Sequence, residues 1–205
     1  LKPSEPIEII RENPDVPASV FEPRRERAMQ VAKPLFGIGV KDTSIPSDPR
    51  ERMKKNAAHS ILNNVLFGRS GEFYNKLYVE GLLSGQFDFG YEINQSFAFN
   101  ALFGESSDPD KVYERFLECV ANAARDGIDR EDFERSRRAM YASMVKCFDS
   151  TEEIANYFLS FRVDDCDLLD YVDIIANISY DDVMNILREV YLPDRYTLSI
   201  VKPLE

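Results

Sequence analysis

The chain has 205 residues, of which 44% are hydrophobic and 30% are charged, so it can form a sizeable globular core. Its 36 acidic and 25 basic residues give a net charge of −11, which repels phosphate backbones and argues against a nucleic-acid partner. No run approaches the roughly 20 apolar residues that cross a bilayer, so no membrane partner is expected. Three cysteines without C-x-x-C spacing favour a reducing compartment, and we expect a cytoplasmic location.

The first 25 residues carry five of the 11 prolines in the chain, with Glu and Ser between them. Such a stretch favours extended backbone and cannot form a core alone. We therefore predict a linker over residues 1–25 and a single domain over residues 26–205. The chain opens with Leu1 and its first methionine is Met29, so we expect the numbering to start inside a longer protein.

The predicted elements begin with an apolar strand over residues 29–40. Residues 48–51 read Asp-Pro-Arg-Glu, a typical helix start with a capping carboxylate and a proline at the first helical position. The spacing of apolar residues continues this helix until Gly68 ends it. A second, shorter helix follows and ends at Gly81.

Two segments with a period of two come next, over residues 87–93 and 97–103. This alternation is typical of half-buried strands, and the Asn-Gln-Ser sequence between the segments indicates a turn. We predict an antiparallel hairpin in which the Phe side chains of both strands form one face, buried under the helices.

From Asp108 onward the pattern is helical, with helix starts predicted near residues 108, 129, 150 and 179. A closing strand is predicted over residues 196–201. The order is strand, two helices, hairpin, several helices and strand. This order favours an α+β fold with an antiparallel-rich sheet and helices packed on one face.

Catalytic chemistry is the feature that this sequence lacks. A catalytic zinc site needs three protein ligands, usually including paired histidines, and His59 is the single histidine of the chain. Neither H-x-x-E-H nor H-E-x-x-H can be written with one histidine, and no G-x-S-x-G sequence marks a nucleophilic serine. We therefore expect no catalytic and no metal-binding residue in this chain.

The segment 66–83, Leu-Phe-Gly-Arg-Ser-Gly-Glu-Phe-Tyr-Asn-Lys-Leu-Tyr-Val-Glu-Gly-Leu-Leu, resembles the helix-turn-helix of the pitrilysin-type zinc peptidases. That family includes insulin-degrading enzyme and the mitochondrial processing peptidase. The order of elements also matches over about residues 20–205, most closely that of the bacterial members. The resemblance implies two homologous halves, of which the N-terminal one carries an inverted H-x-x-E-H motif and zinc. This chain resembles the C-terminal half, which lacks the motif and closes over the substrate.

In many relatives the C-terminal half holds the substrate backbone through an arginine and a tyrosine. Tyr78 and Ser84 stand near those positions here, with Gln86 nearby, so these three are candidate substrate-binding residues and ordinary surface is the alternative. The resemblance implies three partners: a peptide substrate, an N-terminal half that holds zinc, and a homologous subunit. It implies a non-catalytic domain of a zinc-dependent peptidase. The alternative is a peptidase-like scaffold or assembly subunit without proteolytic activity.

Overall fold

The computed structural model describes residues 16–163 and 165–204, and it describes the backbone alone at Ser84. Five strands form one sheet in the order β1-β5-β2-β4-β3. Strand β1 runs parallel to β5, and the remaining neighbours are antiparallel. The strands are β1 (Arg24–Met29), β2 (Leu35–Asp42), β3 (Leu83–Ile93), β4 (Ala98–Ser106) and β5 (Tyr196–Pro203). The helices are α1 (Pro49–Phe67), α2 (Glu72–Val79), α3 (Pro109–Asp126), α4 (Arg130–Lys146), α5 (Thr151–Val163), α6 (Leu168–Asn177) and α7 (Tyr180–Val190).

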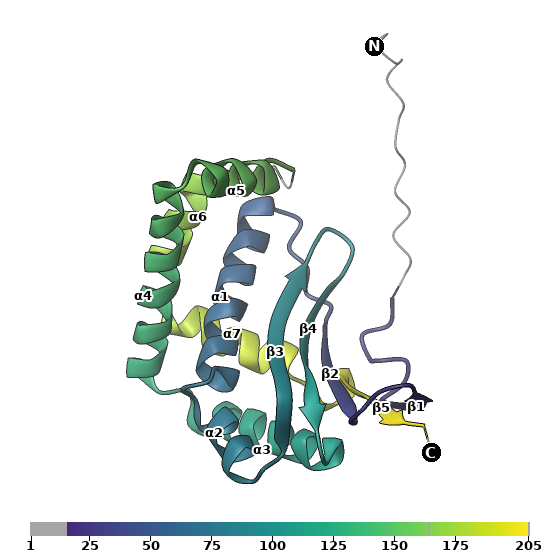
Figure 1. The fold of residues 1–205 in the computed structure, drawn as a ribbon. Coiled ribbons are helices and arrows are strands. Elements are labelled where there is room, and N and C mark those ends of the chain that lie inside the picture. Colours follow the sequence, from purple (N-terminus) through teal and green to yellow (C-terminus); the bar gives the residue numbers. More distant parts are fainter. Residues whose placement is uncertain (1–15, 164, 205) are drawn as a thin grey trace.

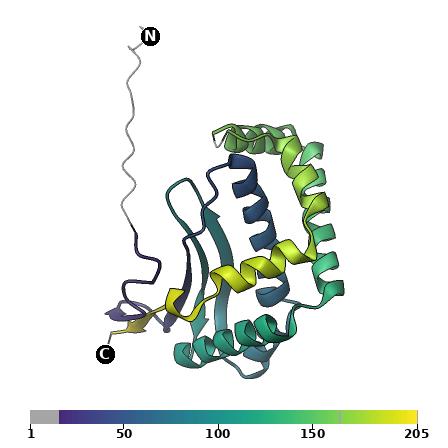
Figure 2. The same ribbon diagram turned by 180° about the vertical axis from the view of Figure 1, so that it is seen from behind.

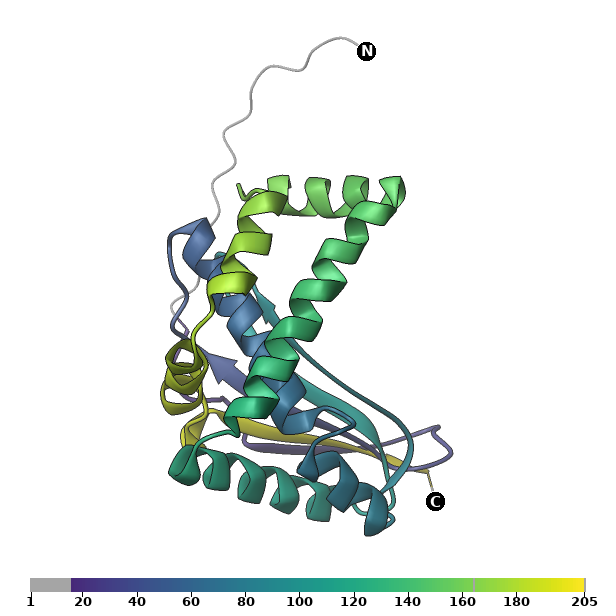
Figure 3. The ribbon, with the colours of Figure 1, turned by 90° about the vertical axis from the view of Figure 1, so that its left-hand side faces the viewer.

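The helices cover one face of the sheet. Seen from behind, α3 and α7 pass in front of the strands (Figure 2), whereas β3 and β4 have no helix in front of them in Figure 1. Helix α4 extends away from the sheet, α5 crosses its far end, and α6 returns toward α7 (Figure 3). This arrangement confirms the α+β fold predicted from the sequence, with a mostly antiparallel sheet.

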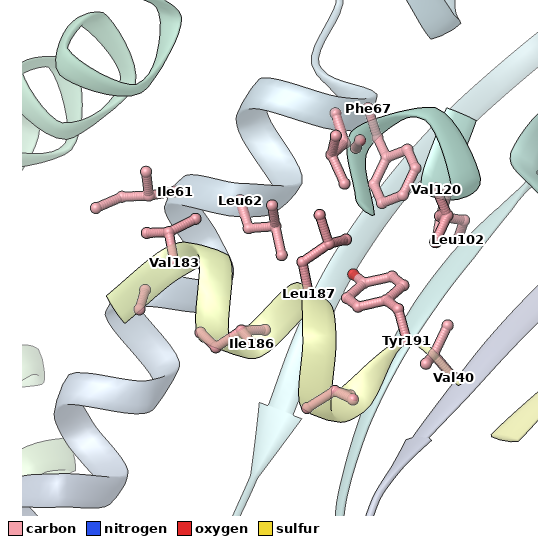
Figure 4. Packing of buried hydrophobic residues seen from close by; sticks show 14 of the residues in the cluster. Val40, Ile61, Leu62, Phe67, Leu102, Val120, Val183, Ile186, Leu187 and Tyr191 are labelled. Atoms are coloured by element: carbon pink, nitrogen blue, oxygen red, sulfur yellow. The ribbon is translucent and has the colours of Figure 1, made fainter. Parts of the chain in front are cut away.

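The core lies between the sheet and helices α1, α3 and α7. Buried and partly exposed residues alternate strictly along β2, as the two-residue period of a strand requires. Leu187 and Tyr191 at the end of α7 point toward Leu62 of α1 and Leu102 of β4 (Figure 4). Burial of these apolar side chains is the main contribution to the stability of the fold.

Several predicted helix starts are confirmed at atomic detail. The Asp48 side chain accepts a hydrogen bond from the backbone N–H of Glu51 at 3.0 Å, and it caps α1. Ser179 and Asp182 form a reciprocal capping box at the start of α7. Helix α6 was not predicted as a separate element, although the Asp167 side chain caps it.

The predicted face of the hairpin was partly wrong. In β3 the aromatic residues do turn toward the helices, and they are partly buried. In β4 the buried positions are instead Ala98, Asn100 and Leu102. Phe99 and Phe103 lie on the opposite face and are 42% and 51% exposed. The pairing of β4 with both neighbours fixes its register, and that register buries the other set of side chains.

The predicted strand over residues 29–40 is split between β1 and β2. Strand β1 begins at Arg24, two residues before the predicted domain boundary, and it is exposed along its whole length as an edge strand. Of the predicted linker, residues 1–15 lie outside the described residues. The following segment contacts β5, because the carbonyl of Glu22 accepts a hydrogen bond from Thr197 Oγ1 at 2.7 Å.

Candidate functional site

The single histidine lies in the core and not at a surface. His59 is 0% exposed, and its ring stacks on Tyr91 of β3 with a centroid distance of 3.5 Å and an interplanar angle of 5°. Its Nε2 lies 3.6 Å from Asp42 Oδ2, which is too long for a hydrogen bond. Neither ring nitrogen has a hydrogen-bond partner.

Asp42 is a buried carboxylate with three direct partners at the end of β2. Its oxygens accept hydrogen bonds from the Tyr91 hydroxyl at 2.7 Å and the Ser44 backbone N–H at 2.9 Å. The Lys55 ammonium lies 2.6 Å away. Burial alone would raise the pKa of Asp42, but these partners and the neighbouring His59 outweigh burial and hold that pKa well below its ordinary value.

Burial lowers the pKa of His59 from 6.5 to about 4, against the opposing effect of Asp42. The imidazole is therefore neutral at pH 7, and a fully buried ring cannot reach a substrate. This geometry gives His59 no role as a general base.

A second buried polar cluster links α1, β4 and the end of α7. The amides of Asn63 and Asn100 exchange hydrogen bonds at 2.8 and 3.0 Å, and Asn100 also donates to the Tyr191 hydroxyl at 2.7 Å. All three side chains are buried. The cluster satisfies its own polar groups, which is the condition for a stabilising buried network.

Within residues 16–163 and 165–204, no group of three or more His, Cys, Asp or Glu side chains could hold a metal ion. In the same part of the chain, no helix is long and apolar enough to cross a membrane. A cavity of about 770 Å³ lies between α1, α4, α5 and α6. None of its described lining residues is a histidine or cysteine, and its walls include Met140, Met144, Tyr157, Tyr171 and Ile175.

The three candidate substrate-binding residues lie near the junction of α2 and β3. Tyr78 is 69% exposed at the end of α2, and Gln86 is exposed on β3. The backbone of Ser84 belongs to β3 as well. The register of β3 shifts between Leu83 and Phe87, so both candidates on β3 lie in a bulge at the free edge of the sheet.

The uncovered face of the sheet carries further exposed side chains that sequence reasoning missed. Asp88 and Glu92 on β3 lie on this face beside Phe103 and Phe99 on β4. The sequence does contain a signal for this arrangement. If Ala98, Asn100 and Leu102 are taken as the buried set, every Phe of β4 lies on the uncovered face. Because Phe97, Phe99 and Phe103 fit the other period, that period favours the opposite face as the buried one.

Comparison with known proteins agrees with this arrangement. The family model described as peptidase M16 inactive domain matches residues 2–140. Over 196 residues the chain is 30% identical to the protein named Uncharacterized zinc protease YmfH from Bacillus subtilis (strain 168). That match covers 96% of this chain and 46% of the relative, so the chain spans about half of the relative's length.

Two solved structures share the fold. An M16-like protein from Alicyclobacillus acidocaldarius has a TM-score of 0.86 at 23% identity, over 93% of this chain and 46% of that one. A protease from Helicobacter pylori has a TM-score of 0.73 at 14% identity, over 88% and 44%. The family model matches more than half of the chain, and the resemblance to pitrilysin-type peptidases is thereby confirmed. The chain belongs to the peptidase M16 inactive domain family.

Proposed function

We propose that this chain is the non-catalytic C-terminal domain of a zinc-dependent peptidase and that it closes a chamber over a peptide substrate. The observation that carries the proposal is the family match, because the matched family is the inactive domain and the Bacillus relative is named a zinc protease. The chain spans 46% of that relative, which leaves room for a catalytic half.

In this proposal the zinc chemistry belongs to an N-terminal half outside the chain, where a metal-bound water would attack the peptide bond. The lack of a metal-binding group among the described residues supports this division. Residues 1–25 would connect the two halves, and a homologous subunit would complete the assembly. We also propose a cytoplasmic location, because an odd number of cysteines fits a reducing compartment.

The contribution of this domain to substrate binding rests on its surface. The free edge at β3 can pair with an extended peptide through backbone hydrogen bonds. Ser84 and Gln86 belong to that edge strand, and Tyr78 lies on α2 just before it in the chain, so these three are proposed to contact the bound peptide.

The test removes this domain from the complete protein and leaves the upstream half intact. We expect the upstream half to keep its zinc and to lose peptide hydrolysis at least ten-fold, because the substrate is no longer held from both sides. Unchanged kcat/KM in the upstream half would contradict the proposal. A complete protein that contains zinc but hydrolyses no peptide would instead favour the scaffold or assembly alternative.

A further inference from the structure

Two aromatic–acid pairs recur on the uncovered face of the sheet. In the register of β3 and β4, Phe99 lies directly opposite Glu92, and Phe103 lies directly opposite Asp88. Side chains at directly opposed positions of an antiparallel pair lie on the same face with Cβ atoms about 5 Å apart. All four side chains are exposed. Each pair therefore places a carboxylate beside an exposed aromatic ring, and the Phe99 ring also stacks on Phe97 with a centroid distance of 6.0 Å.

On the uncovered face, the residues between the two pairs have almost no side chain. Gly90 lies opposite Ala101 there, and a Cβ added to Gly90 would meet no atom within 4 Å. The two pairs are four positions apart along each strand, which corresponds to about 13 Å. A ligand lying on this face thus meets two similar pairs, each of one Phe and one carboxylate, with small residues between them.

The β3 and β4 side of this face is acidic, with Asp88, Glu92 and Glu105 at outward positions. The basic outward residues are Lys41 on β2, directly opposite Phe99, and Arg25 and Arg27 on β1 at the far edge of the sheet. The Lys41 ammonium is already engaged, because it donates to the backbone carbonyls of Pro17 and Ser19. Asp88 is held in place by a hydrogen bond from the backbone N–H of Phe89 at 2.8 Å. The carboxylates beside the Phe rings are thus left to attract a cation from outside.

We propose that this surface, named here the Phe–acid strip (Asp88, Glu92, Phe99 and Phe103), binds extended peptide segments that carry two basic residues four positions apart. A Lys or Arg side chain lays its alkyl stem along an aromatic ring and brings its charge to the adjacent carboxylate. In an extended peptide, residues i and i+4 point to the same side about 13 Å apart, which matches the two pairs.

Residue i+2 of the same peptide would lie over Gly90 and Ala101, the two small residues between the pairs. This inference rests on the proposed function, because it assumes that the domain binds peptides, and it adds the face of the sheet beside β3 as a second contact surface. The net charge of −11 acts in the same direction, because it attracts cationic peptides at long range.

The test measures binding by the complete protein, with a chelator present so that hydrolysis does not interfere. The probe is a fluorescently labelled extended peptide with Lys at i and i+4, read by anisotropy. Control peptides carry norleucine at both positions, or Lys at i and i+2. We expect the i, i+4 peptide to bind about ten-fold more tightly than either control, and the difference to shrink in high salt.

The matched variants are the double substitution Asp88→Asn with Glu92→Gln, and Glu114→Gln on the exposed side of α3 as the control. The double variant should abolish the preference for the basic peptide and leave norleucine binding within two-fold, whereas Glu114→Gln should change neither. Equal binding of all three peptides by the unmodified protein, or a preference that survives the double variant, would overturn the inference. Hydrolysis of the same peptides without chelator tests the proposed function separately.

Discussion

At the scale of single residues, the core contains a histidine that is kept neutral by its surroundings. His59 is enclosed by Tyr91 on one side and lies near the Asp42–Lys55 pair on the other. Burial lowers its pKa to about 4, whereas in the unfolded chain the pKa returns to about 6.5. The unfolded state therefore takes up a proton more readily than the folded state.

This difference predicts a pH dependence of stability. The contribution from His59 is fully present above pH 6.5 and is lost as the pH falls toward about 4, with a slope of up to about 1.4 kcal/mol per pH unit. The lowered pKa of Asp42 adds a separate loss at more acidic pH, below its ordinary value of about 4.

The variant His59→Phe should reduce this slope, because Phe keeps a ring against Tyr91 and takes up no proton. The measurement is urea unfolding of both proteins at intervals between pH 7 and pH 4.5, where His59 is the single histidine that can titrate. Parallel curves for the two proteins across that range would show that His59 is not protonated on unfolding.

The contacts of His59 and Asn63 depend on the fold and not on local sequence. The single histidine was enough to expect no catalytic zinc site in the chain without any knowledge of the fold. The stacking of His59 on Tyr91 and the pairing of Asn63 with Asn100 could not be predicted, because each joins residues more than 30 positions apart. Such contacts depend on the register of the sheet against α1.

At the scale of secondary structure, the caps and periods in the sequence predicted most elements. Helices α1, α3, α4 and α7 begin at the predicted capping residues. The predicted strand over residues 29–40 contained only Met29 of β1. The sequence of β1, Arg-Arg-Glu-Arg-Ala-Met, has no apolar alternation, and an exposed edge strand needs none. In β4 both sets of alternate residues contain apolar side chains, so the period could not decide which face is buried.

The capping box of α7 supports a second prediction. Ser179→Ala removes the side chain that accepts a hydrogen bond from the Asp182 backbone N–H at 3.1 Å, and we expect a loss of about 1 kcal/mol in the free energy of unfolding. Ser143→Ala on the exposed part of α4 is the control and should change that energy by less than about 0.5 kcal/mol. Equal effects from the two substitutions would show that the cap contributes nothing specific.

At the scale of the whole molecule, one face of the sheet builds the core and the other stays uncovered. The helices α1, α3 and α7 stabilise the fold from one side, and the Phe–acid strip lies on the opposite side. The resemblance of residues 66–83 predicted the family, whose matching model is that of an inactive domain, and no metal-binding group is found among residues 16–163 and 165–204. The Phe–acid strip could not be predicted from the sequence, because its residues come together only through the pairing of β3 with β4.

The central proposal is that this chain carries no zinc chemistry of its own and serves a catalytic half outside it. The most direct test compares the purified 205-residue chain with the complete protein in hydrolysis of a quenched fluorescent peptide, with and without a zinc chelator. We expect the chain alone to hydrolyse the peptide no faster than a protein-free blank, and the complete protein to show hydrolysis that the chelator abolishes. Chelator-sensitive hydrolysis by the chain alone, with contaminating protease excluded, would contradict the proposal.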